Sequence, residues 1–354
     1  MSLLSPILQS VLSPISESIS GAVSRYFTTF DAVAQSYILL SSDVGIPSST
    51  DYEIEFDVIP DGTTQVVIGK KEGVNPRVRI LSNGDIQWEA NNSGGTIVRT
   101  PSNLEVGKLN RVRLVKSGLS TSIIVNGVQA GTQETVGIDA ANFNQLGRAF
   151  NFPPSGGRVS DLKAWSGGDR DTGSLIFDMP INQNYTPTNN TVIDLSGNGN
   201  NGTFVNVADG DSTLYTQNSD GDWVGENLVE NGGFSSTSGW DDTSQGTGTA
   251  QITAGRAIVT GTTFANRGQL SQSIDTTAGQ MYRVTFTCLQ DQTAFIVVSE
   301  SFGGSLEVFN IPSEGAHSFT FTATTSSTDV VLRSQGGESI FDDVTVEPFL
   351  EVAY

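Results

Sequence analysis

Alternation of apolar and polar residues with a period of two is the feature that most restricts the fold of this chain. In residues 51–58 an apolar side chain occupies every second position, and acidic residues stand between them. The same alternation returns in residues 77–80, 111–114 and 282–288. Successive side chains of a strand point to opposite faces, so this period is typical of strands that bury one face.

Turn signals separate these short alternating segments. Asn126-Gly127 follows an alternating run directly and predicts a tight hairpin, and Ser82-Asn83-Gly84-Asp85 precedes another run. The 39 glycines supply many such turns, and no convincing helical period follows residue 26. The sequence therefore predicts an all-β fold built from antiparallel sandwiches.

Two glycine-rich phrases divide the chain. DLSGNGNNGTF closes one strand-rich region, NLVENGGFSSTSGW opens another, and a polar run lies between them. A length of 354 residues suits two domains with a short appendage. We expect two tandem antiparallel β-sandwich or jelly-roll domains with a short N-terminal helical segment, divided into residues 1–26, 27–217, a linker at 218–226, and 227–350.

The charge balance excludes several classes of function. The formal net charge is −20, which disfavours binding to nucleic acid or to anionic lipid. A single cysteine, Cys288, rules out an intrachain disulfide framework, and it cannot form a zinc cluster with the single histidine, His317. No segment is long and apolar enough to span a membrane, so we expect no membrane insertion.

Residues 1–26 have a different period. Apolar side chains recur there at steps of three or four, which is the spacing of one helix face, although Pro6 and Pro14 interrupt it. A signal peptide fits poorly because residues 2–20 contain no Lys or Arg. The stripe either packs on its own domain or joins the chain to other copies and to a larger assembly. It consists of Leu4, Leu8, Val11, Ile15, Ile19 and Val23.

The outward-facing charges of the first domain allow two interpretations. Arg77, Arg79, Arg111 and Arg113 could present a basic face to an acidic ligand. Acidic residues face outward on residues 51–58, so cross-strand ion pairs within a sheet are the simpler account and the one we prefer.

Several segments of the first domain resemble the concanavalin-A-like, laminin-G-like lectin/glucanase family. They are FDAVAQSYILL, DYEIEFDVIP, LNRVRLVKSG, SIIVNGVQAG, GGRVSDLKAW and DLSGNGNNGTF. The last segment usually opens such a domain, so the order looks circularly permuted. The resemblance implies a sandwich that binds glycans, hydrolyses them or serves as a spacer. Hydrolases need paired carboxylates across a cleft, and the Glu-x-Asp-x-x-Glu pattern of similar glucanases is missing.

Two tryptophans of this domain receive different interpretations. Trp165 is out of phase with Leu162 and Ala164, so it is a candidate platform for a sugar face, or it covers a sheet edge or an interface. Trp88 is in phase with Ile86 and Ala90, which predicts a core position.

The second domain resembles the family 4/9 carbohydrate-binding modules. The matching segments are NLVENGGFSSTSGW, LSQSIDTTAGQMYRVTFTC and SIFDDVTVEP. The resemblance implies a jelly roll, a core position for Trp240, and a structural calcium held between the opening phrase and the closing strand. Asp342 is the candidate ligand, because its alternation with Ile340, Val344 and Val346 predicts a buried carboxylate. Ser235 departs from the acidic residue that the family usually has there.

These observations predict a non-enzymatic structural protein of a bacteriophage virion, such as a fibre, a spike or a capsid decoration. It would lie on the virion surface, form a homotrimer, contact other virion proteins through residues 1–26 and bind surface polysaccharide. The alternatives are a secreted bacterial polysaccharide-binding or adhesion protein and a glycoside hydrolase or lyase. The secreted protein needs an export signal, and the hydrolase or lyase needs an acid pair that the sequence does not show.

Overall fold

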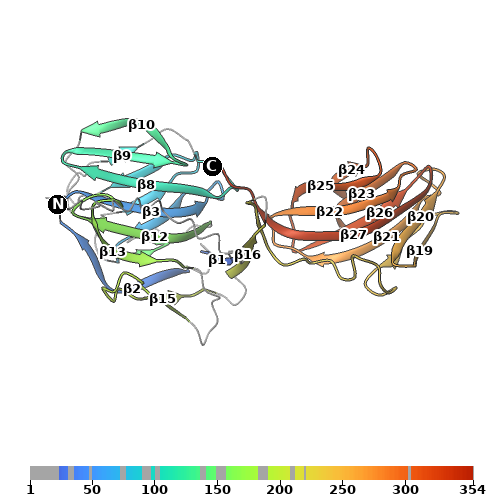
Figure 1. The fold of residues 1–354 in the computed structure, drawn as a ribbon, viewed down its shortest axis with the longest axis horizontal. Helices are drawn as coiled ribbons and strands as arrows, with labels where there is room; N and C mark the ends of the chain where they lie inside the picture. The colour runs from blue at the N-terminus through green and yellow to red at the C-terminus, as the bar shows by residue number, and fades with distance from the viewer. Residues whose placement is uncertain are drawn as a thin grey trace, which may run out of the picture.

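Two β-sandwiches lie side by side in the computed structural model (Figure 1). The structure describes residues 24–30, 36–47, 50–71, 77–89, 97–99, 104–135, 141–148, 157–181, 190–207, 212–218, 221–301 and 304–353. All regular elements within these ranges are strands, and their pairings are antiparallel. The predicted all-β class is confirmed. The predicted N-terminal helical segment falls almost entirely on residues 1–23, outside the described ranges. No described helix is long and apolar enough to cross a membrane.

The first sandwich begins with a sheet that we call the charged sheet. Hairpin turns such as Asn126-Gly127 connect neighbouring strands, with Asn126 in the left-handed conformation (φ 52°). The strands in spatial order are β10 (Val128–Thr135), β9 (Ser120–Val125), β8 (Asn110–Ser117), β3 (Tyr52–Ile59), β12 (Arg158–Ser166), β1 (Ser24–Thr29), β16 (Ser212–Gln217) and β17 (Trp223–Val224), with β13 (Ser174–Met179) beside β12.

The opposing sheet of the first sandwich contains both early and late segments of the domain. Residues 202–205 pair with residues 37–40, so the last part of this domain lies next to its beginning. The order is β14 (Thr191–Val192), β15 (Gly202–Val205), β2 (Tyr37–Ile46), β11 (Ala141–Leu146), β4 (Gln65–Gly69), β5 (Arg77–Ile80), β6 (Ile86–Glu89) and β7 (Ile97–Arg99).

The second sandwich consists of two five-stranded layers. One layer has the order β19 (Thr249–Thr253), β20 (Arg256–Gly261), β27 (Gly337–Leu350), β22 (Met281–Gln290) and β25 (Gly315–Thr322). The other, which we call the open sheet, has the order β18 (Asp241–Asp242), β21 (Gly268–Asp275), β26 (Ser327–Ser334), β23 (Ala294–Ser301) and β24 (Gly304–Asn310).

Each sandwich has its own core. In the first, Tyr52 on β3 meets Trp88 on β6 edge to face, with ring centroids 5.6 Å apart, so the predicted core position of Trp88 is confirmed. In the second, Trp240 packs against Phe234 and is 7% exposed. Cys288 is buried in the same core, and burial raises its pKa to about 11. It therefore behaves as a small apolar side chain rather than a reactive thiol.

Ion pairs cover the outer face of the charged sheet. Arg113 binds both carboxylate oxygens of Glu53 (2.6 and 2.8 Å), and Arg111 binds both of Asp57 (2.8 and 2.9 Å). Glu53 and Asp57 are almost fully buried beneath these guanidinium groups. On the opposing sheet Arg77 and Arg79 both pair with Glu89. These ion pairs confirm the preferred interpretation, cross-strand pairing, and they contradict a free basic face on these strands.

A continuous sheet joins the sandwiches. Trp223 and Val224 on β17, inside the predicted linker, pair with Leu350 and Phe349 on β27. The chain then returns to the first sandwich, where the Leu109 amide donates to the Glu351 carbonyl (2.9 Å). A small apolar cluster fills this joint, formed by Ile59, Leu109, Tyr215, Trp223 and Leu350.

Candidate functional site

Trp165 lies on the outer face of the charged sheet. It stands opposite Glu53 on β3 and Leu175 on β13, and its side chain is half-buried. It lines neither of the two cavities described below. The partial exposure agrees with the phase argument, and a role as a sugar platform stays a prediction.

The burial predicted for Asp342 is wrong. Asp343 adopts a left-handed conformation (φ 52°) at a bulge where β27 pairs with β22, and this bulge reverses the alternation. Phe341 and Val344 therefore both point into the core, while Asp342 is half-buried on the other side and accepts the Asp343 amide.

The residues around Asp342 do not supply an evident calcium cage. The opening phrase does reach the closing strand, because the Gly232 carbonyl accepts the Val344 amide (3.0 Å). Among the described residues, however, no three His, Cys, Asp or Glu side chains gather as metal ligands would. Calcium binding stays a prediction that these side chains do not support.

The six residues of the apolar stripe cannot be placed. Their positions fall outside the described ranges, so the predicted oligomerisation role stays a prediction. They are Leu4, Leu8, Val11, Ile15, Ile19 and Val23.

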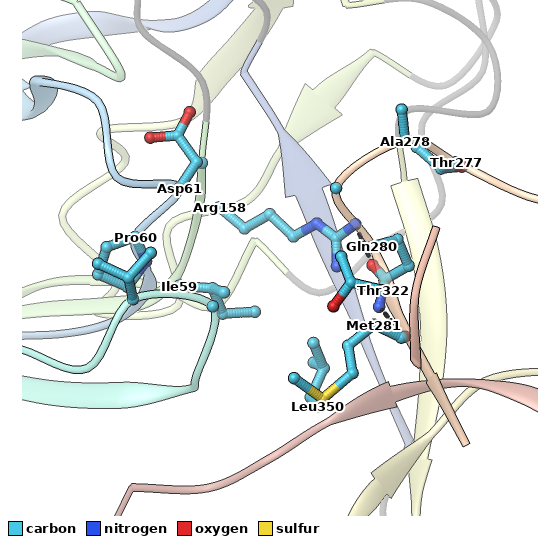
Figure 2. A pocket seen from close by; sticks show the side chains of 14 residues that line it. Ile59, Pro60, Asp61, Arg158, Thr277, Ala278, Gln280, Met281, Thr322 and Leu350 are labelled. Carbon is cyan, nitrogen blue, oxygen red and sulfur yellow. Dashed lines mark hydrogen bonds between the residues drawn. The ribbon is translucent and has the colours of Figure 1, made fainter. Parts of the chain in front are cut away.

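A cavity of about 460 Å³ lies at the joint between the sandwiches (Figure 2). Arg158 from β12 extends into it and donates to Gln280 of the second sandwich (2.6 Å) and to the Tyr215 hydroxyl (2.9 Å). The Gln280 amide in turn donates to the Met281 carbonyl (2.6 Å). Because these polar groups bind one another, we interpret the cavity as part of the contact between the two sandwiches rather than as a ligand site.

A second cavity, of about 300 Å³, lies on the outer face of the open sheet. Val297 on β23 and Val331 on β26 form its floor, and they are 5% and 3% exposed although they point away from the core. A turn at residues 262–266 raises Phe264 beside them, with 63% of its surface exposed. We call this cavity the face cavity.

Two arginines border the face cavity. Arg267, directly before β21, lies with its guanidinium carbon 4.3 Å from the Phe264 ring centroid, and that of Arg333 on β26 lies 6.0 Å from it. Gln245 and Gln269 add amide groups to the wall. An exposed aromatic ring beside planar donors is an arrangement that can hold a sugar ring by stacking and hydrogen bonds.

Arg267 and Arg333 bring two positive charges to a partly buried place. Burial lowers the pKa of both guanidinium groups, and the nearby charge of Arg267 lowers the pKa of Arg333 further. Neither forms an ion pair within the described part of the chain, and no acidic side chain is among the described residues that line the cavity. The cavity therefore concentrates positive charge on a strongly acidic protein.

Sequence reasoning missed this site. One signal was available: residues 295–298 and 330–332 are continuous apolar runs rather than alternating ones, which indicates strands covered on both faces. The role of Phe264 and Arg267 had no such signal, because it depends on how one turn folds over the sheet.

Comparison with protein families finds one match in the first sandwich. Residues 33–168 match the model of the concanavalin A-like lectin/glucanases superfamily, Laminin_G_3, so this part of the chain is similar to that superfamily. A comparison with curated proteins gives no significant match.

Solved structures similar to the chain include a CBM4 carbohydrate-binding module, with 18% identity, 34% of this chain and 99% of the module covered, and a TM-score of 0.28. A heptameric SAP-like pentraxin from Limulus polyphemus shares 18% identity, with coverage of 40% and 76% and a TM-score of 0.32. The enzymatically active domain of bacteriophage CBA120 tailspike protein 4 shares 15% identity, with coverage of 35% and 21% and a TM-score of 0.28.

Proposed function

We propose that this chain is a non-enzymatic glycan-binding protein and that its second sandwich holds polysaccharide in the face cavity. The observation that carries the proposal is the exposed Phe264 ring, which stands over an apolar floor with guanidinium and amide donors around it. The lectin/glucanase family match of residues 33–168 supports the same class of function for the first sandwich.

Binding would use two kinds of contact. The Phe264 ring offers an apolar face to the C–H side of a sugar ring, while the guanidinium group of Arg333 can donate to its hydroxyl oxygens. The site lies on a sheet face rather than in a closed pocket, so a long chain can cross it. Individual contacts of this type are weak, and repeated copies of the protein would raise the overall affinity.

The biological setting is a further part of the proposal. We propose a structural subunit of a bacteriophage virion, a fibre, spike or capsid decoration at the particle surface, that attaches to host or environmental polysaccharide. A homotrimer held by the apolar stripe of residues 4–23, which would also contact other virion proteins, fits the helical spacing found there. A secreted bacterial polysaccharide-binding protein is the alternative.

Affinity electrophoresis of the full chain in gels that contain one polysaccharide each tests the binding proposal. At least one polysaccharide should retard the wild-type protein, and Phe264→Ala should reduce the retardation at least about tenfold because stacking is lost. Leu119→Ala is the matched control, since Leu119 is equally exposed (67%) but lies in the first sandwich. A sugar-release assay on the same polysaccharides should show no product, and product would contradict the non-enzymatic assignment.

Light scattering tests the assembly proposal. The full chain should have three times its monomer mass of 37.5 kDa, and Leu8→Asp with Ile15→Asp should reduce it to one monomer mass. A monomeric wild-type protein would contradict the trimer.

Melting temperatures of the full chain, measured in calcium and in a chelator, test the calcium prediction, which requires a higher melting temperature with the ion.

A further inference from the structure

The face cavity contains charge that neutral sugars do not require. Arg25, Arg77, Arg79, Arg111, Arg113, Arg170 and Arg283 all form ion pairs with Asp or Glu in the described structure. Arg267 and Arg333 form none, although the chain has 38 acidic residues and only 18 basic ones. Acidic residues are therefore abundant in the chain, and the described residues that line this cavity include none of them.

The hydrogen bonds of the two arginines are also incomplete. Arg267 uses Nε on Gln269 (2.7 Å) and Nη1 on the Phe264 carbonyl (2.6 Å), and its Nη2 has no partner among the described residues. The side chain of Arg333 makes no hydrogen bond to the described residues, and its Nε is buried without a partner. A buried donor without an acceptor is costly, and a ligand oxygen would remove that cost.

The arrangement fixes what such a ligand must offer. Arg267 is held in one orientation by its two bonds, so its open edge is ready before the ligand arrives. A guanidinium group binds planar or tetrahedral oxyanions through two parallel hydrogen bonds. Phe264 lies within reach of both guanidinium groups and requires a ligand with an apolar face next to its anion.

We infer that the face cavity selects acidic polysaccharides, in which Arg333 and Arg267 bind the carboxylate of a uronic acid or a sulfate ester while Phe264 stacks on the sugar ring. This inference rests on the proposed glycan-binding function and names its ligand class. The net charge of −20 opposes every polyanion, acidic polysaccharides as well as nucleic acid and anionic lipid, so binding would depend on the local charge of Arg267 and Arg333. The proposed glycan-binding function selects polysaccharide among these sources of the anion.

Calorimetry of the full chain with two matched pairs of polymers tests the inference. Polygalacturonate and its fully methyl-esterified form share one backbone and differ in free carboxylates, and dextran sulfate and dextran differ in sulfate. The protein should bind one acidic polymer at least about tenfold more tightly than its neutral partner. This difference in affinity should become smaller as the salt concentration rises from about 0.05 M to about 0.5 M. The polymer pair that shows the difference in affinity identifies carboxylate or sulfate as the anion.

Variants separate the site from general charge effects. Arg333→Gln and Arg267→Gln should each weaken binding of the acidic polymer about tenfold and leave the neutral polymer within about twofold. Arg256→Gln removes the same charge from an exposed position at the start of β20, in the other layer, and should change the affinity for neither polymer. Unchanged melting temperatures would show that the variants remain folded.

Three results would overturn the inference. Equal binding of acidic and neutral polymers would leave the glycan function in place and remove the selectivity. An equal loss in Arg256→Gln would assign any preference to overall charge, and binding of DNA through Arg333 would make the ligand something other than a glycan. No binding of any polysaccharide, neutral or acidic, would reject the proposed function itself.

Discussion

The outer faces of the charged sheet and of the open sheet use arginine in opposite ways. On the charged sheet, Arg111 and Arg113 each bind a buried carboxylate through two hydrogen bonds, from Nε and from Nη2. On the open sheet, Arg267 and Arg333 surround an exposed ring and have no acidic partner in the described structure. The comparison teaches that the number of arginines on a strand face says little until their partners are known.

The largest effect should come from breaking a pair on the charged sheet. Arg113→Ala leaves the Glu53 carboxylate, which is 0% exposed, without the two hydrogen bonds from Arg113 and with only the long one from the Arg170 amide (3.4 Å). We expect a loss of about 3 kcal/mol or more in the free energy of unfolding, measured by urea denaturation. Glu105→Ala, at an exposed ion pair with Lys108, is the control and should cost less than about 1 kcal/mol. Similar losses in both variants would mean that the charged face is not tightly paired.

Asp194 is a second buried carboxylate whose partners all lie within the protein, and it extends the comparison to a group that is not bound by arginine. Asp194 accepts the amides of Asp178, Ser196 and Asn200, each at 3.0 Å. Burial alone would raise its pKa, but the Ser196 hydroxyl and these amides outweigh burial, so the pKa lies below its ordinary value. We expect Asp194→Asn to cost about 2 kcal/mol at neutral pH, because the carboxylate acceptor is lost.

The pH dependence of that loss has a defined sign. A lowered folded-state pKa contributes stability above the unfolded pKa of about 4, and this contribution is lost as the pH falls through the folded value. The difference between wild type and Asp194→Asn should therefore shrink below about pH 4 in urea unfolding. Asp242→Asn is the control, because the exposed Asp242 carboxylate accepts the Ser244 amide, and it should cost much less than Asp194→Asn. A difference in the free energy of unfolding between wild type and Asp194→Asn that does not change with pH would contradict the role of the ionised carboxylate.

The smallest effect on stability should come from the open sheet. Arg333→Gln removes a partly buried charge that has no ion-pair partner and that lies near a like charge. We expect a change within about 0.5 kcal/mol in the same unfolding measurement, or a slight gain. A loss as large as that of Arg113→Ala would mean that Arg333 is structural and would remove the contrast between the two faces.

The sequence predicts the fold better than the site, for physical reasons that particular residues illustrate. Trp88 and Cys288 sit in alternating segments, and the alternation directly reports a buried face. Asp342 fails the same argument because one left-handed residue, Asp343, shifts the phase of β27. Alternation counts residues and cannot show an extra one in a bulge.

The face cavity was hidden for a different reason. Arg333 is 66 residues from Arg267 in the chain, and only the pairing of β21 with β26 brings them to the same end of one sheet. The lack of acidic residues around Arg267 and Arg333 also depends on the folded structure and cannot be seen in the sequence. Arg111 and Arg333 look alike in the sequence, since each lies within an apolar strand segment.

The joint between the sandwiches has a mechanical consequence. The chain passes from the first sandwich to the second through β17 and returns along the end of β27 to Leu109, so two adjacent strands span the junction (Figure 1). A tether of one strand would let the second sandwich swivel freely, whereas two crossings resist torsion and divide any pulling load. Force exerted on the second sandwich would pass into the first through both strands at once.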